Sequence, residues 1–254
     1  GVVNTTNSGT RLVLHDGNYP DPPYSENTGT TAPSLYSPSR ERSVVLGDFT
    51  HDGYLDVARN TVGAITVSEN AGSSPWYPNS LRTHYTSSSP TSTYSYNTEG
   101  LGWIDYDGDG DLDLLAQNED ESAVILENDP VGTLTQLTQT EVNAIGFTAS
   151  ANGDYLAMGD VEPDGDIDVL LRMPGTTIPP DLYLNDGDGT FTASAAFNED
   201  ADGFKGGSEF CDLDNDGDLD ILWSEQPLNI WENDGMGGWI DTGEPLTSSG
   251  VGDP

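Results

Sequence analysis

A nine-residue acidic segment recurs four times along the chain, at residues 48–56, 105–113, 160–168 and 212–220. Its consensus is D-x-[D/E/T]-x-D-G-x-[L/I]-D, with Asp at the first, fifth and ninth positions of every copy. Glycine always holds the sixth position, where a loop that wraps around an ion must turn sharply. The copies begin 57, 55 and 52 residues apart. A period of this length is typical of propellers, solenoids and other repeat arrays.

Side-chain oxygens recur at the first, third, fifth and ninth positions of each segment, and a backbone carbonyl is available at the seventh. Ca²⁺ accepts about six to eight such oxygens in loose geometry, whereas Mg²⁺ demands a stricter octahedron. The sequence therefore predicts four calcium loops rather than four solvated acidic turns. The expected ligand positions are Asp48, Thr50, Asp52, Tyr54 and Asp56; Asp105, Asp107, Asp109, Asp111 and Asp113; Asp160, Glu162, Asp164, Asp166 and Asp168; and Asp212, Asp214, Asp216, Asp218 and Asp220.

The loops differ at the third position. Thr50 stands there in place of a carboxylate, so the Asp48–Asp56 site is expected to be the weakest. Glu162 is longer than Asp and is expected to shift the ion or to bind it through water.

The loops are not EF-hand loops, which carry a bidentate Glu at the twelfth position on a following helix. The residues at that position are Arg59, Ala116, Leu171 and Trp223. Each loop instead runs into a short, apolar, β-prone segment that is typical of a buried strand. We therefore expect each loop to join one strand to the next.

A second landmark follows each loop, namely an apolar run that reaches an asparagine, at Asn70, Asn128, Asn185 and Asn233. Glycine soon after that asparagine indicates a hairpin turn. A further β-prone run comes next, so each repeat contains four strands with the calcium loop between the first two. Four antiparallel strands per repeat describe a propeller blade.

The two ends of the chain together supply one more blade. Residues 1–17 align with the second and third strands of a blade, and residues 251–254 align with the end of a first strand. We therefore predict a single all-β domain, a five-bladed propeller closed by the two ends; a piece of a longer array of about six to eight blades is the alternative. The expected blades are residues 1–40 with 247–254, 41–90, 91–143, 144–198 and 199–246.

The composition restricts partners and compartment. The net charge is −37 with only seven basic residues, whereas nucleic-acid binding needs clustered Lys and Arg, so nucleic acid is excluded as a partner. No apolar run approaches membrane-span length, so no membrane insertion is expected. Cys211 is the only cysteine, which rules out an internal disulfide. Calcium outside the cell would keep weak loops filled, so an extracellular or cell-surface location is expected.

These motifs resemble the FG-GAP-like or VCBS repeat, which is related to the calcium-binding blades of integrin α-chain propellers. The best matches are residues 212–220 and 182–191, and the resemblance covers nearly the whole chain. It implies a β-propeller with calcium between the first and second strands, usually on secreted or surface proteins. Family roles include adhesion, glycan binding and accessory domains of larger proteins and some polysaccharide lyases. The Phe-Gly and Gly-Ala-Pro signatures of integrin repeats are not clear here, so an integrin-like ligand does not follow.

Ligand binding is expected on the face opposite the calcium loops, because turns in a meander alternate between faces and binding loops lie on a rigid scaffold. The polar connection at residues 86–100 offers Tyr94 and Tyr96, although a plain linker is the alternative. Arg172 ends a second strand on that face. Trp76 and Trp239 lie at or just beyond turns on the calcium face and are further candidates.

The leading prediction is a secreted, calcium-stabilised binding or adhesion module for carbohydrate or an extracellular protein ligand. One alternative is a structural or assembly repeat of a surface fibre or larger multidomain protein. Another is a polysaccharide-active, lyase-like enzyme or its accessory domain. No G-x-S-x-G, H-E-x-x-H or phosphate-binding loop is present in the sequence, so no catalytic residue is assigned. The sequence does not determine the oligomeric state.

Overall fold

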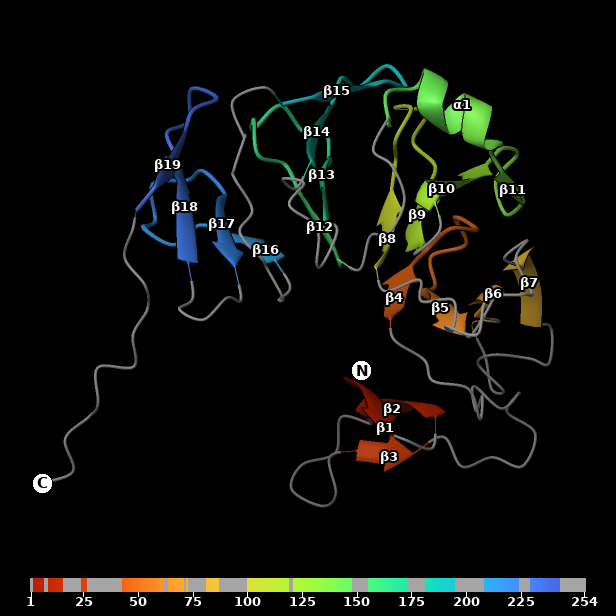
Figure 1. Ribbon diagram of the computed structural model, residues 1–254. Coiled ribbons are helices and arrows are strands. Elements are labelled where there is room, and N and C mark those ends of the chain that lie inside the picture. Colours follow the sequence, from red (N-terminus) through yellow and green to blue (C-terminus); the bar gives the residue numbers. More distant parts are fainter. Residues whose placement is uncertain are drawn as a thin grey trace, which may run out of the picture. The chain divides into compact units, whose positions relative to one another are not determined.

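The computed structural model of the chain consists of β-strands and one short helix in the part that it describes (Figure 1). The described residues are 2–6, 9–15, 24–26, 43–61, 64–70, 72, 81–86, 100–118, 121–147, 155–172, 181–194, 208–223 and 229–242. Among them, no helix is both long enough and apolar enough to span a membrane.

Within the described ranges, the strands form five sheets in which neighbours in sequence are also hydrogen-bonded neighbours. The first sheet has three strands: β1 (Val2–Thr6), β2 (Gly9–His15) and β3 (Tyr24–Glu26). Both of its strand pairs are antiparallel. The first two strands fall where the sequence predicts the second and third strands of a blade. Residues 251–254, which would close that blade, lie outside the described part, so the closure stays a prediction.

The other four sheets have four strands each. The second sheet contains β4 (Val44–Gly47), β5 (Asp56–Thr61), β6 (Ala64–Ser68) and β7 (Leu81–Thr86). The third contains β8 (Leu101–Ile104), β9 (Asp113–Asn118), β10 (Glu121–Asn128) and β11 (Leu134–Gln136). The fourth contains β12 (Tyr155–Gly159), β13 (Asp168–Arg172), β14 (Asp181–Asn185) and β15 (Phe191–Ala193). The fifth contains β16 (Ser208–Cys211), β17 (Asp220–Trp223), β18 (Asn229–Asn233) and β19 (Trp239–Asp241).

This order is the meander of a propeller blade, so the prediction of an all-β chain built from four-stranded antiparallel repeats is confirmed. Packing divides the chain into two compact units. Unit 1 comprises residues 1–103, 111–116 and 125–137, and unit 2 comprises residues 104–110, 117–124 and 138–254.

In unit 1, β4 and β8 are packed through aromatic side chains. Phe49, which follows β4, is fully buried and stacks on Trp103 of β8 with ring centroids 5.6 Å apart and an interplanar angle of 8°. A Cβ atom at Gly47 would lie 2.6 Å from the same indole ring, so a larger residue at that position would displace Trp103. The sheet that contains β4 also contributes the buried side chains of Val57 and Ile65.

In unit 2, the fourth and fifth sheets share one hydrophobic core, and β12 contacts β16. Its buried members are Ala157, Val161, Leu170, Leu182, Phe210, Ile221 and Trp231. Leu184, Leu219 and Trp239 are partly buried and pack against it. The core therefore joins the two sheets on which the loops 160–168 and 212–220 are mounted.

The helix α1 (Gln139–Ala144) was not expected from the repeat pattern. It begins with a capping box in which Thr138 and Glu141 bond each other's backbone, and this Thr-x-x-Glu spacing is visible in the sequence. The carbonyl of Ile145, just after the helix, accepts a hydrogen bond from Phe191 N–H at 2.7 Å. Phe147 then packs on Tyr183 and Phe191, with centroids 4.8 and 4.4 Å apart. These contacts fix the segment against β14 and β15.

Candidate metal centres

Each acidic loop connects the first and second strands of a four-stranded sheet, as the sequence predicts. The loops lie between β4 and β5, β8 and β9, β12 and β13, and β16 and β17. The ninth-position Asp of each loop is the first residue of the second strand. The rest of each loop therefore lies beyond the ends of the first two strands of its sheet.

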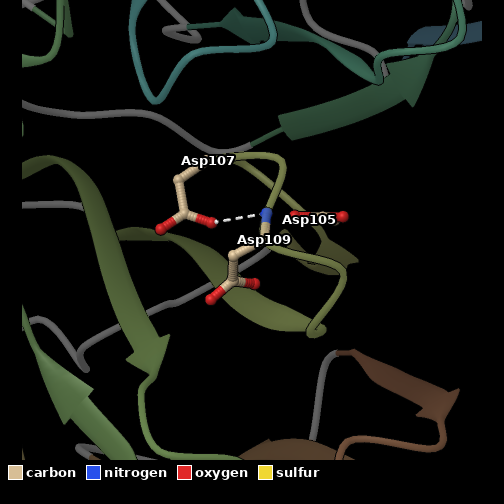
Figure 2. Close-up of side chains that lie close together, drawn as sticks. All are labelled: Asp105, Asp107 and Asp109. Atoms are coloured by element: carbon tan, nitrogen blue, oxygen red, sulfur yellow. Dashed lines mark hydrogen bonds between the residues drawn. The ribbon is translucent and has the colours of Figure 1, made fainter.

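Carboxylates gather at the first, third and fifth positions of two loops. Asp105, Asp107 and Asp109 each offer one oxygen, and these oxygens lie within 4.8 Å of one another (Figure 2). The equivalent residues Asp212, Asp214 and Asp216 form a second triad of the same kind. Like charges this close repel one another, and a divalent cation among them would remove that cost. Both triads could hold a metal ion, and an all-oxygen donor set suits a hard cation such as Ca²⁺.

Backbone hydrogen bonds to the first Asp hold each loop in its wrapped shape. The sixth-position glycine donates its N–H to that carboxylate in three loops, with N···O distances of 2.8 Å to Asp48, 3.0 Å to Asp105 and 3.1 Å to Asp160. In the fourth loop, the N–H of Asp216 donates to Asp212 at 3.1 Å. The glycines have φ between +88° and +104°, a backbone region that strains any L-residue with a side chain. The invariant glycine thus has the role that the sequence indicates.

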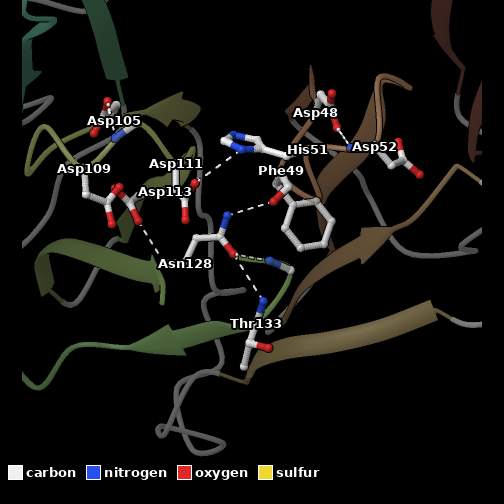
Figure 3. A network of polar contacts seen from close by, with 12 residues as sticks. Asp48, Phe49, His51, Asp52, Asp105, Asp109, Asp111, Asp113, Asn128 and Thr133 are labelled. Atoms are coloured by element: carbon white, nitrogen blue, oxygen red, sulfur yellow. Dashed lines mark hydrogen bonds and ion pairs between the residues drawn. The ribbon is translucent and has the colours of Figure 1, made fainter. Parts of the chain in front are cut away.

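The seventh residue of the loop, whose carbonyl is the expected ligand, also forms a hydrogen bond to the fifth residue. Its N–H donates to the fifth-position carboxylate, from Tyr54 to Asp52 at 2.9 Å, and the same bond recurs from Asp166 to Asp164 at 3.1 Å and from Asp218 to Asp216 at 3.0 Å. The fourth member of this set, Asp111, lies 3.4 Å from the Nδ1 atom of His51 (Figure 3).

The first loop departs from the others at its third position. The Oγ1 atom of Thr50 donates to Oδ2 of Asp56 at 3.3 Å, so this hydroxyl forms a hydrogen bond within its own loop. Among the described residues, the close carboxylate triad occurs in the loops 105–113 and 212–220, whose third residue is Asp. Thr50 and Glu162 occupy the third position in the remaining loops.

Replacing Thr50 by Asp is expected to raise the calcium affinity of the loop 48–56 by roughly ten-fold, because it restores the missing ligand charge. Hydrogen–deuterium exchange of the loop peptide during a calcium titration would measure the change. Thr140→Asp, which adds the same charge to the exposed first half of α1, serves as the control. An unchanged titration midpoint for Thr50→Asp would contradict the importance of the third position.

The ninth-position aspartates Asp56, Asp113, Asp168 and Asp220 are buried, each with at most 2% of its surface exposed. In every case the Oδ1 atom accepts the backbone N–H of the asparagine that ends or follows the third strand, with N···O distances of 2.7 to 3.0 Å. The Oδ2 atoms of Asp168 and Asp220 also accept the N–H of the second loop residue, at 2.7 and 2.8 Å. Besides being candidate ligands, these carboxylates therefore tie the loop to its sheet, a role that the sequence did not reveal.

Burial makes ionisation of Asp56 and Asp168 costly. Burial raises the pKa of Asp168 to about 6, and the N–H groups of Asn185 and Val161 only partly oppose this shift. Burial likewise raises the pKa of Asp56. Partial burial, followed by the nearby charges of Asp164 and other acids, raises the pKa of Glu162. A bound cation would favour the ionised forms, so the electrostatics of the loops also suit a cation site.

The predicted ligand-binding residues lie mostly beyond the described part. Tyr94, Tyr96 and Trp76 are outside it, and for Arg172, the last residue of β13, only the backbone is described. Trp239, the first residue of β19, is partly buried. It lines a small open hollow of about 30 Å³ beside the loop 160–168. The other lining residues are Val161, Glu162, Leu184, Ser194, Asn233 and Gly237.

Comparison with known families identifies the repeats. Residues 105–171 and 160–223 match the FG-GAP-like repeat. The chain therefore carries FG-GAP-like repeats, and the matched segments include the loops 105–113, 160–168 and 212–220. No curated protein matches the chain.

Among solved structures, a lectin of Agrocybe aegerita that specifically recognises non-reducing terminal N-acetylglucosamine superposes with a TM-score of 0.60. The match covers 92% of this chain and 59% of the lectin at 19% sequence identity, so the chain spans about three-fifths of the lectin's length. At this identity the likeness shows a shared, propeller-like fold. A chain of the Photorhabdus luminescens Tc holotoxin pore also matches, over 79% of this chain and 12% of its own length, at 14% identity and with a TM-score of 0.31.

Proposed function

We propose that this protein is a calcium-stabilised propeller that binds carbohydrate outside the cell. The observation that carries the proposal is the hollow beside Trp239, in which an indole and polar side chains meet next to a candidate metal loop. The fold that the chain shares with a lectin supports the same reading.

Four calcium ions are proposed, one in each acidic loop, with the site at residues 48–56 the weakest. The twenty positions named from the sequence would supply the ligands, the seventh through its carbonyl. Five blades are proposed with the boundaries given above, the last strand of the chain closing onto the first three. Extracellular calcium would keep the loops filled, which supports a secreted or cell-surface location.

The side chains around the hollow suit a sugar ring that would stack across its open side. An indole face packs well against the apolar C–H face of a pyranose, while a few placed polar groups fix its orientation. Trp239 offers the aromatic surface, and Glu162 and Ser194 offer a carboxylate and a hydroxyl for sugar hydroxyl groups. Because Glu162 is the third residue of a metal loop, the proposed sugar site is on the calcium-loop side. The sequence had favoured the opposite side, which carries Tyr94 and Tyr96.

A glycan array probed in millimolar calcium tests the proposal, with terminal N-acetylglucosamine among the displayed sugars. Binding by the native chain is expected, and Trp239→Ala should weaken it at least ten-fold because the stacking surface is lost. Met236→Ala is the matched control, since Met236 is 88% exposed on the preceding turn and does not line the hollow. Circular dichroism should show that both variants are folded.

Failure to bind any glycan, or full binding by Trp239→Ala, would contradict the proposed sugar site. A chain that takes up calcium but binds no glycan would instead support the structural or assembly role.

A further inference from the structure

An asparagine follows or ends the third strand of each four-stranded sheet, at Asn70, Asn128, Asn185 and Asn233. Two of its groups make equivalent hydrogen bonds in all four sheets. Its backbone N–H donates to the ninth-position Asp of the loop in the same sheet. Its Oδ1 atom accepts the N–H of a glycine in the following turn at 2.8 to 3.1 Å. These bonds fix the direction of the remaining group, the side-chain amide nitrogen.

In two sheets that amide nitrogen reaches the metal loop of the preceding sheet. Within unit 1, Nδ2 of Asn128 donates to the carbonyl of Phe49 at 2.8 Å (Figure 3). Within unit 2, Nδ2 of Asn233 donates to the carbonyl of Val161 at 2.9 Å. Both contacts are buried and join residues 79 and 72 positions apart. In each case the acceptor is the second residue of an acidic loop.

The second loop residue lies between two of the candidate ligands, so its peptide groups influence where both carboxylates point. In the loop 160–168, Val161 stands between Asp160 and Glu162. Its N–H is held by Oδ2 of Asp168 and its carbonyl is held by Asn233. The residue is thus fixed from both sides, once by its own loop and once by the next sheet.

We propose that Asn128 and Asn233 are positioning residues for the metal loops of the preceding sheets, so that the calcium affinity of one loop depends on the sheet after it. The inference rests on the proposed calcium sites. A loop whose second residue is already fixed loses less conformational freedom when the ion binds, and its affinity is correspondingly higher. Asn233 also bonds Asp220 through its N–H, so one residue links the loops 160–168 and 212–220.

Asn70 provides a matched comparison. Its Nδ2 atom donates to the carbonyl of Leu55 in its own loop at 3.2 Å, just as Asn233 donates to Leu219 of its own loop at 3.3 Å. Asn70→Ala and Asn233→Ala therefore remove the same contacts to the turn glycine and to their own loop. Asn233→Ala additionally removes the bond to Val161 of the preceding sheet.

Hydrogen–deuterium exchange during a calcium titration of the full chain reports the calcium midpoint of each loop separately. In Asn233→Ala, the midpoint of the loop 160–168 is expected to rise at least about five-fold, while that of the loop 105–113 stays within about two-fold of native. Asn70→Ala is expected to affect its own loop, 48–56, and to leave the loop 160–168 unchanged. Should Asn233→Ala fail to fold, Asn128→Ala read at the loop 48–56 provides the same test within unit 1.

An unchanged midpoint for the loop 160–168 in Asn233→Ala would overturn the positioning role while leaving the calcium sites intact. Equal shifts in all loops would also overturn it, because they would indicate general destabilisation. If the native loops gained no protection from calcium, the calcium assignment would fail, and the positioning role with it.

Discussion

Removing calcium is expected to lower the Tm of the protein by at least about 15 °C. A ligand present at about 100 times its Kd stabilises a fold by about 2.7 kcal/mol per site. Three or four such sites would sum to about 8–11 kcal/mol, and 1 kcal/mol shifts Tm by about 2–4 °C in a chain of this size. The chain already carries a net charge of −37, so emptying the loops adds repulsion among the carboxylates.

Calorimetry in millimolar calcium and in a calcium-selective chelator measures this effect. Magnesium supplied with the chelator is the control for divalent charge alone, and it should restore only part of the loss because its geometry is stricter. Equal Tm values with calcium and with chelator would mean that the loops are not metal sites that support the fold.

Asp220→Asn is expected to cost about 2–4 kcal/mol of unfolding free energy, and to do so even without calcium. Asp220 is 1% exposed, and its two oxygens accept the N–H groups of Asn233 and Leu213 at 3.0 and 2.8 Å. An amide in its place would turn an NH₂ group toward one of these donors, so that this N–H and the NH₂ group would both lack an acceptor. The loss of unfolding free energy therefore comes from the hydrogen bonds that hold the loop to its sheet rather than from the metal.

Asp218→Asn is the matched control, because it makes the same change of charge two residues earlier in the same loop. Asp218 is only half-buried, and its backbone N–H rather than its carboxylate bonds Asp216, so this variant should lose less than about 0.5 kcal/mol in chelator. Denaturant titrations of both variants in chelator and in calcium give the comparison. Similar stabilities for the two variants in chelator would show that Asp220 has no separate structural role.

The repeat could be predicted from sequence because the constraints are local. The sixth-position glycine, the spacing of the acids and the apolar runs that follow each lie within a few neighbouring residues, and the strands appear in the expected order. The Thr-x-x-Glu capping box before α1 is equally local, but the four-strand repeat left no place for a helix. The unusual third residue of the first loop, Thr50, was also evident from alignment of the repeats.

The hydrogen bonds that hold the loops to neighbouring sheets could not be predicted in this way. The bond from Asn233 to Val161 joins residues of different sheets, 72 positions apart, and only the packing of the two sheets brings them together. A sequence pattern identifies Asn233 as a turn residue and gives no acceptor for its side chain. The same holds for the hollow, since Trp239 and Glu162 line it together because the fourth and fifth sheets share a core.

Native mass spectrometry of the full chain, buffer-exchanged from millimolar calcium, tests the calcium assignment most directly because it counts the bound ions. The predicted result is a species with four calcium ions, with the ion of the loop 48–56 leaving first as calcium is lowered and retained longer in Thr50→Asp. A chain that retains no calcium, or that retains magnesium equally well in its place, would contradict it.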